Sequence, residues 1–178
     1  MIGRLLRPIR ASAARGPLAA AALTAPHTLT VTSPAFADGD PMPVRCAGPG
    51  VGDNVSPELR WQGLSGDTRQ LILGLDDVDV PLPMPLLHNV AVLAPSLGGL
   101  DEGAFGPEPG VRVVPTRLSS TGYSGPRPIP GHGPHRYRFQ LLALDCRVPG
   151  EVDTVKAVLA AAAGHVLARG MLTGTYER

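Results

Sequence analysis

The chain has only two cysteines, few aromatic residues and a near balance of charge. Cys46 and Cys146 lie far apart and form no C-x-x-C pair, which argues against a zinc or redox motif. We expect two free structural thiols, with a single disulfide as the alternative. Lys and Arg number 16 against 15 Asp and Glu, so net charge indicates no preference for nucleic acid or acidic membranes. No apolar run reaches the roughly 20 residues of a transmembrane helix.

Glycine and proline are abundant, with 22 and 20 of the 178 residues. They are scattered between apolar runs and form no repeat, a pattern typical of many short strands joined by turns. The length suits one domain with a proper core. Apolar patterning predicts strands at residues 29–33, 70–75, 88–94, 111–116, 136–144 and 171–176. Helical spacing over residues 152–166 predicts one helix near the C-terminus. This is a mostly β chain with a sandwich-like count of strands.

The first 27 residues contain four arginines and no acidic residue, followed by the short apolar run 18–25. Basic residues followed by an apolar run are the order found in an export signal. Here, however, Pro17 and Pro26 bracket an apolar run of only eight residues, which is short for such a signal. The alternative is an amphipathic helix, because several apolar residues share one helical face: Ile2, Leu5, Leu6 and Ile9. We expect residues 1–27 to be an amphipathic or flexible arm on a domain of residues 28–178. We expect a cytoplasmic protein, with export as the alternative if the arm acts as a signal.

A Gly- and Pro-rich loop leads into the strand predicted at residues 136–144. It delivers His135, Arg136 and Tyr137 at its end. Proline fixes φ and glycine permits φ above zero, so such a loop is stiff and approaches a ligand closely. A stiff loop that carries His and Arg to a strand end indicates an anion pocket.

An acidic segment follows the strand predicted at residues 70–75. In an extended chain, Asp77 and Asp79 point to the same side, and His88 begins the next apolar run. Taken alone, a D-x-D segment is more often a solvated loop than a binding site. A histidine that begins an apolar strand is more often structural than a ligand contact.

The order of these motifs is more specific than any one of them. The chain carries N-x-S-P-x-L-x-W from Asn54 to Trp61, then D-x-D-x-P, a His-led strand, and G-P followed by H-R-Y. From about Thr28 onward it resembles the phosphatidylethanolamine-binding protein family, also known for the Raf kinase inhibitor protein, and especially its bacterial branch. The resemblance implies a two-sheet β-sandwich with one or two peripheral helices. It also implies a small pocket for phosphate-bearing or other anionic ligands.

The family's pocket positions map onto matching residues of this chain. The resemblance implies that the ligand is bound by Asp77, His88, Gly125, Pro126, His135 and Tyr137. It implies structural support of the pocket by Asp79, Pro81 and Arg136. Two positions depart from the family pattern: Val78 replaces a proline, and Asn89 stands where a tryptophan often follows the pocket histidine. These departures predict a less rigid loop and a pocket without an aromatic wall.

The chemistry of these residue types agrees with an anion site. Protonated histidines donate charge-assisted hydrogen bonds, which are roughly twice as strong as neutral ones, and amides near Gly125 add further donors. Asp77 would repel an anion, so we expect it to hold a ring nitrogen of His88 or His135. Alternation along the strand turns Arg136 away from its neighbours. We therefore expect Arg136 to pair with Asp79.

Five other side chains receive structural interpretations. His27 and His132 lie in Pro- or Gly-flanked loops and are expected to be exposed. His165 and Trp61 are expected to pack on or in the sandwich, and Tyr123 either lines the pocket rim or packs beneath the loop.

Three classes of function remain open. The first is a non-enzymatic binding or regulatory module for an anionic or phosphorylated ligand, with a kinase or protease as the partner that the family implies. The second is a hydrolase that uses the Asp and His cluster, with or without zinc, and the third is an interaction domain with a relic pocket. The chain lacks H-E-x-x-H, G-x-S-x-G and G-x-x-x-x-G-K-[ST], which favours the binding module without catalytic residues, metal or cofactor. Bacterial relatives suggest a homodimer.

Overall fold

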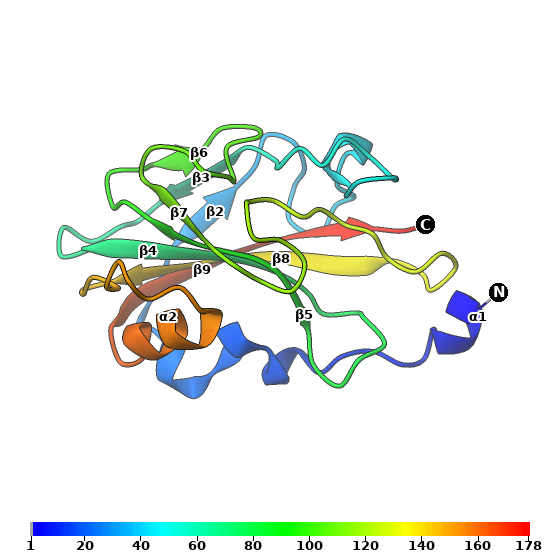
Figure 1. The fold of residues 1–178 in the computed structure, drawn as a ribbon, viewed down its shortest axis with the longest axis horizontal. Coiled ribbons are helices and arrows are strands. Elements are labelled where there is room, and N and C mark those ends of the chain that lie inside the picture. The colour runs from blue at the N-terminus through cyan, green and yellow to red at the C-terminus, as the bar shows by residue number, and fades with distance from the viewer. Residues whose placement is uncertain (1) are drawn as a thin grey trace.

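The protein is a β-sandwich with a helical layer on one outer face (Figure 1). A computed structural model describes residues 2–178. The larger sheet has the strand order β1-β9-β8-β4-β5-β7 and the smaller β2-β3-β6. The strands are β1 (His27–Thr28), β2 (Thr30–Thr32), β3 (Leu59–Gln62), β4 (Gln70–Asp77), β5 (Leu86–Leu93), β6 (Gly99–Leu100), β7 (Val111–Val114), β8 (His135–Leu144) and β9 (Val166–Tyr176). The helices are α1 (Ile2–Leu6), α2 (Val155–Ala162) and the 3-10 turns η1 (Ala13–Arg15), η2 (Pro17–Ala19), η3 (Ala21–Leu23) and η4 (Val44–Cys46). The expected mostly β, two-sheet fold with a helix near the C-terminus is confirmed.

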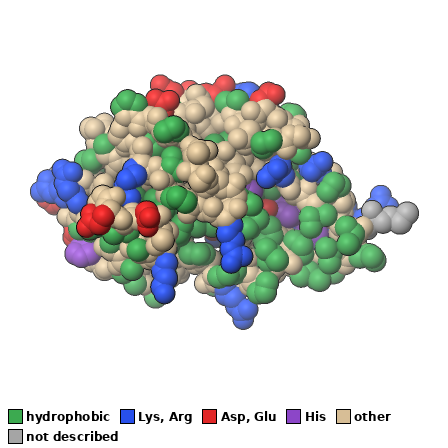
Figure 2. Space-filling view, viewed as in Figure 1, with side chains coloured by type: hydrophobic (Ala, Val, Ile, Leu, Met, Phe, Trp, Pro, Cys, Tyr) green, Lys and Arg blue, Asp and Glu red, His purple; other side chains and the backbone are tan. Residues whose placement is uncertain are grey.

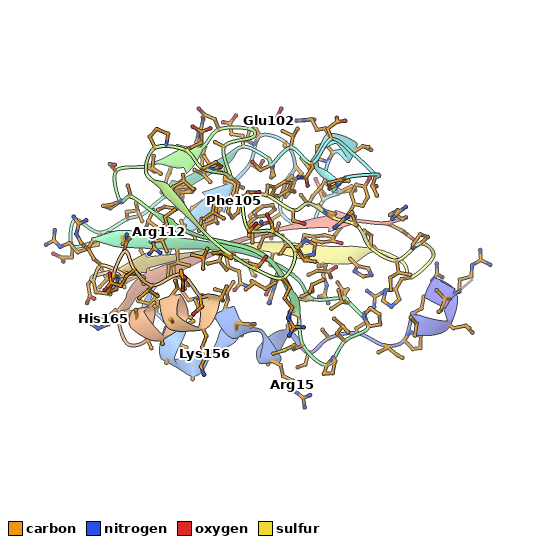
Figure 3. All side chains as sticks on the ribbon, in the orientation of Figure 1. Arg15, Glu102, Phe105, Arg112, Lys156 and His165 are labelled. Carbon is orange, nitrogen blue, oxygen red and sulfur yellow. The ribbon has the colours of Figure 1, made fainter. Side chains whose placement is uncertain are left out.

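The large sheet is covered on both faces, which explains why its central strands are almost continuously apolar. Trp61, Phe105 and Phe139 belong to the core between the two sheets, where Phe105 is labelled in Figure 3. The outer face carries a second core, to which α2 contributes Val158 and Ala162. The sheet is therefore the middle layer of the domain.

The N-terminal arm contributes to that second core. Leu18 and Leu23 are fully buried in it. Leu18 fills the space that a side chain at Gly74 would need, since a Cβ there would lie 2.4 Å from Leu18 Cδ1. Arg169 donates to the carbonyl oxygens of Leu18 (2.9 Å) and Leu23 (3.2 Å).

The apolar face predicted for the start of the arm does not pack. Ile2, Leu5 and Ile9 are largely exposed, and α1 contacts the domain through its backbone at Gly3. The helix has only five residues, which is too short to present a continuous apolar stripe.

Two boundaries differ from the sequence prediction. The helix predicted to residue 166 ends at Ala162, and Gly164 adopts a φ of 80° in the turn that follows. Val166 already belongs to β9, which is longer than predicted because it pairs with nearly all of β8. Strands β1, β3 and β6 were not predicted, since strands of two, four and two residues carry little periodic signal. Both cysteines are free thiols.

Strand register brings the motif residues to one end of the large sheet. β4 pairs with β8 so that Asp77 lies opposite Tyr137. A bulge between Leu75 and Asp76 shifts the register against β5, and bulges commonly re-aim side chains beside functional sites. The end of β4, the start of β8 and His88 near the start of β5 therefore meet.

Candidate functional site

A cavity of about 470 Å³ lies where these strand ends meet. Five of the predicted site residues line it, namely Asp77, Pro81, His88, His135 and Tyr137. The remaining wall is formed by Val80, Leu82, Leu86, Leu118, Arg127, Pro128, Ile129 and Arg178. Apart from the histidines and Tyr137 the wall has no ring side chain other than proline, as the missing tryptophan predicts. In Figure 2, histidine, arginine and apolar side chains gather on the side of the molecule where the β4–β5 loop lies.

His88 presents one ring nitrogen to this cavity. Its Nδ1 lies 2.8 Å from the carbonyl oxygen of Ser124. A carbonyl only accepts, so Nδ1 carries the proton and Nε2 is left for a ligand. Burial lowers the pKa of His88, although the hydrogen bond to Ser124 acts in the opposite direction. The ring is therefore neutral at pH 7, and its Nε2 is an acceptor.

Tyr137 presents a fully buried hydroxyl group to the cavity. Asp77 and the backbone of Arg127 lie near this hydroxyl, but no group within residues 2–178 forms a hydrogen bond of normal geometry with it. Burial, followed by the charge of Asp77, raises the pKa of Tyr137 far above its ordinary value. The hydroxyl thus stays protonated and is available as a donor. An unsatisfied buried hydroxyl costs about 1–3 kcal/mol, so its presence beside a cavity is a sign of a ligand position.

His135 has both ring nitrogens engaged within the protein. Its Nδ1 lies 2.7 Å from Asp77 Oδ2, and its Nε2 lies 2.6 Å from His132 Nδ1. In this arrangement His135 has no nitrogen left to donate to a ligand, unlike His88. Of the two rings that we expected Asp77 to hold, it contacts His135.

The expectation that His132 is exposed is wrong. Its ring is fully buried between His135 and the carbonyl oxygen of Leu6, which lies 2.8 Å from Nε2. A Gly- and Pro-flanked histidine looks like a surface residue because its covering partner comes from the distant N-terminal arm. The H-x-x-H spacing was the available signal.

Asp79 and Arg136 form a bidentate pair behind the pocket wall. Arg136 Nε and Nη2 donate to the two carboxylate oxygens at 2.9 Å each, and Arg10 Nη1 lies 3.1 Å from Asp79 Oδ1. Burial alone would raise the pKa of Asp79, but the hydrogen bonds and charge of Arg136, with Arg10, lower it. Asp79 and Arg136 do not line the cavity, and Arg10 was not anticipated from the sequence.

Gly125 and Pro126 also lie outside the cavity lining. The amide of Gly125 donates to Asn54 Oδ1 at 2.9 Å, so it is already used. A Cβ at Gly125 would lie 2.0 Å from the Cys46 carbonyl oxygen, and the Gly48 amide donates to the Pro126 carbonyl. In this structure both residues pack the loop against η4, and direct ligand contact at these positions stays a prediction.

Asn89 and Tyr123 fix the loop that carries Ser124. Asn89 Oδ1 accepts from the Ser124 amide at 3.0 Å, and its Nδ2 donates to the Gly122 carbonyl. The Tyr123 hydroxyl donates to the Cys46 carbonyl at 3.0 Å, so this side chain packs beneath the loop and does not line the pocket. The residue that replaces the family tryptophan thus positions the partner of His88.

The pocket side chains do not form a metal-ligating group among the described residues. The group that does, Asp145, Cys146 and His165, lies beyond the opposite end of β8, where His165 is labelled in Figure 3. The expectation that His165 packs on the sandwich is wrong, because its side chain is half exposed and pairs with Asp145 at 2.8 Å. Trp61 is buried in the core as expected.

The fold and the pocket together define a β-sandwich binding protein, and comparisons identify the family. The model of the phosphatidylethanolamine-binding protein family matches residues 32–177. A Mycobacterium tuberculosis protein that carries the name lipoprotein LppC is 35% identical over 158 residues, covering 86% of this chain and 74% of the relative. A UPF0098 protein of Methanothermobacter thermautotrophicus is 38% identical over 131 residues, covering 71% and 85%.

Two solved structures share the architecture. The phosphatidylethanolamine-binding protein homolog CT736 from Chlamydia trachomatis has a TM-score of 0.75 and 30% identity, covering 85% of this chain and 99% of its own. YbcL from Escherichia coli has a TM-score of 0.73 and 25% identity, covering 84% and 98%. The chain therefore belongs to the phosphatidylethanolamine-binding protein family, in its bacterial, YbcL-like branch. Membership supports a role as a binding protein.

None of the helices within residues 2–178 has the length and apolarity needed to cross a bilayer.

Proposed function

We propose that this protein is a non-enzymatic binding protein whose pocket takes a small phosphate-bearing or other anionic ligand. The observation that carries the proposal is the buried, unpartnered hydroxyl of Tyr137 beside the Nε2 of His88 in one cavity. Arg127 and Arg178 also line the cavity and favour negative charge there. Each charge-assisted hydrogen bond to a ligand contributes roughly twice as much as a neutral one.

The protonation of the two groups selects among anions. Tyr137 donates, whereas neutral His88 accepts. A phosphate ester monoanion matches both, since one oxygen accepts from Tyr137 and its P–O–H donates to His88. A carboxylate such as acetate has no proton to donate at pH 7, so His88 would first have to take up a proton from solvent, although burial lowers its pKa. The pocket should therefore prefer a phosphate monoester to acetate.

A second, apolar cavity suggests that the ligand extends beyond its anionic group. This groove of about 690 Å³ shares Leu82 and Leu86 with the pocket and continues over Met84, Leu87 and Val155. It is the larger of the two but contains neither His88 nor Tyr137, so we place the polar group in the pocket and only an apolar part of a ligand in the groove.

Histidine ring resonances provide the test. Inorganic phosphate, phosphoethanolamine and acetate are titrated into the protein at pH 6, where the second proton of a phosphate ester, with a pKa of about 6, is partly retained. We expect saturable shifts at His88 and His135, strongest for the phosphates, and we expect the shifts at His135 to be lost in His88→Ala. A His88 ring that ignores all three anions overturns the proposal.

The protein partner, the oligomeric state and the cellular location complete the proposed function. We propose that the ligand-bound protein acts on a protein partner, a kinase or protease, as a homodimer in the cytoplasm, with export as the alternative. Family membership supports binding, and the lipoprotein name of one relative favours testing export. Size-exclusion chromatography with light scattering tests the dimer, and cell fractionation with N-terminal sequencing of the mature chain tests the location.

A further inference from the structure

The start of the N-terminal arm is clamped to the loop that precedes β8. Arg7 Nε donates to the carbonyl of Gly131 at 2.9 Å, and Arg10 Nη1 donates to the carbonyl of Pro134 at 3.0 Å. Gly3 lies so close that a Cβ there would be 2.2 Å from the Pro130 carbonyl oxygen. These contacts join residues more than 120 positions apart in the sequence.

The opposite side of the same loop is a wall of the ligand pocket. The loop residues that line the cavity are Arg127, Pro128, Ile129 and His135. Residues 2–10 of the arm line neither this cavity nor the apolar groove, which the arm reaches only through Pro17. The contacts of residues 2–10 can therefore act on an anion in the pocket only through the position of this loop.

The hydrogen bonds of His132 and His135 show how the clamp is held. The Leu6 carbonyl can only accept, so His132 Nε2 carries a proton, and the Asp77 carboxylate accepts from His135 Nδ1. If both rings were neutral, His132 Nδ1 and His135 Nε2 would face each other as two lone pairs at 2.6 Å. That arrangement is repulsive, so one further proton must lie between the rings.

A row of three contacts thus holds one proton each. The contacts join the Leu6 carbonyl to His132, His132 to His135, and His135 to the Asp77 carboxylate. Asp77 Oδ1 also accepts from the Asp79 amide at 2.8 Å, so both oxygens of this carboxylate are used within the protein. Both rings are at most 1% exposed.

Other charged and titratable groups surround this pair from every neighbouring element. Arg136 balances Asp79, the ring of Tyr137 stacks near His135, and Arg10 Nη2 also donates to the His132 carbonyl at 3.4 Å. Arg7 also faces Glu177 at 4.0 Å, and the main-chain oxygen of Arg178 accepts from the Gly131 amide at 2.7 Å.

We propose that His132 is a positioning residue of the pocket. By sharing one proton with His135, it clamps the N-terminal arm to the loop of residues 127–135 and holds that loop in the shape that an anion needs. Docking of the arm and binding of an anion therefore strengthen each other. The effect on the anion rests on the proposed function, whereas the link between His132 and the arm does not.

Two variants and one control separate these links. Gly3→Ala places a methyl group against the Pro130 carbonyl and the His132 amide, and His132→Phe removes the proton-sharing ring. Gly66→Ala adds the same methyl group where nothing lies within 4 Å. Arm release is measured as the rate of trypsin cleavage after Arg10, identified by mass spectrometry, and affinity is measured with phosphoethanolamine.

We expect Gly3→Ala and His132→Phe to cleave faster after Arg10 and to bind phosphoethanolamine about tenfold more weakly, since a loosened wall must be ordered on binding. Gly66→Ala should match the wild type in both.

Different failures have different meanings. If Gly3→Ala releases the arm but keeps its affinity, the inference is overturned while the proposed function stands. If the wild type binds none of the anions, the proposed function fails. The cleavage measurement still decides the clamp in that case, because a cleavage rate in His132→Phe equal to that of the wild type rejects it.

Discussion

The ring of Tyr137 stands edge-on to the ring of His88, with 5.4 Å between the ring centroids and 89° between the ring planes. This relationship places a hydroxyl donor and an imidazole acceptor against one cavity. The other hydrogen bonds of the site are internal: Asp77 holds His135, and Asp79 holds Arg136. Asp77, Asp79 and Arg136 thus build the pocket, whereas the neutral groups of His88 and Tyr137 remain for the ligand in a cavity that Arg127 and Arg178 also line.

Replacing Tyr137 by phenylalanine should not destabilise the protein. The hydroxyl has no partner within the described chain, and removing an unsatisfied buried polar group is neutral or stabilising by about 1 kcal/mol. Chemical denaturation of Tyr137→Phe and the wild type measures this difference. A loss of more than about 2 kcal/mol would mean that the hydroxyl is satisfied inside the protein.

His88 should make the free energy of unfolding depend on pH. Its pKa is lowered in the folded protein, so the unfolded chain binds the proton more tightly. The stability linked to neutral His88 is therefore complete above the unfolded pKa of about 6.5 and is lost as the pH falls toward the folded pKa. Urea unfolding between pH 5 and pH 8 should show this loss in the wild type and a flatter profile in His88→Gln. Parallel profiles would contradict the assignment.

Asp79 should matter for stability more than for ligand binding. Its carboxylate is nearly fully buried and satisfied by Arg136, so Asp79→Asn should cost about 2–4 kcal/mol by leaving donors unpaired. Because the folded pKa of Asp79 is lowered, its contribution is present above about pH 4 and lost at lower pH.

Arg136→Ala is the companion test of that role. It should also destabilise the protein. It should change the affinity for phosphoethanolamine by less than about threefold, which is a smaller binding free energy than the roughly 1.4 kcal/mol of a tenfold change. A variant that keeps its stability and loses the ligand would show that Arg136 contacts the anion.

The packing of Leu18 on Gly74 predicts a coupled pair of mutations. Gly74→Ala should cost about 1–3 kcal/mol because its methyl group would overlap Leu18, and Leu18→Ala about 2–5 kcal/mol through the cavity it leaves. The double variant should be more stable than the sum of the two losses implies, since each change relieves the other. Additive losses would mean that the arm does not pack here in solution.

The central strands and the residues of the pocket could be predicted from the sequence. Leu71 to Leu75 and Leu141 to Leu144 are buried on both faces of the sheet, so their apolar runs carry a strong strand signal. Asp77, His88, His135 and Tyr137 were found by the order of motifs, and strand pairing brings them together.

The site features that could not be predicted from the sequence depend on contacts between distant segments. His132 lacks any local reason for burial, because its partners are His135 and the backbone of Leu6. Which nitrogen of His88 faces the cavity is set by the Ser124 carbonyl, and both nitrogens of His135 are taken by Asp77 and His132. No pattern of residue types along the chain encodes these contacts.

The most direct test of the anion pocket is a calorimetric titration of phosphoethanolamine at pH 6 into three proteins. These are the wild type, Tyr137→Phe, and Tyr123→Phe as the matched loss of a buried hydroxyl outside the cavity lining. We predict saturable binding by the wild type and Tyr123→Phe, and binding at least about tenfold weaker by Tyr137→Phe, the cost of one lost hydrogen bond to a charged ligand. Equal affinities in Tyr137→Phe and the wild type would contradict the account.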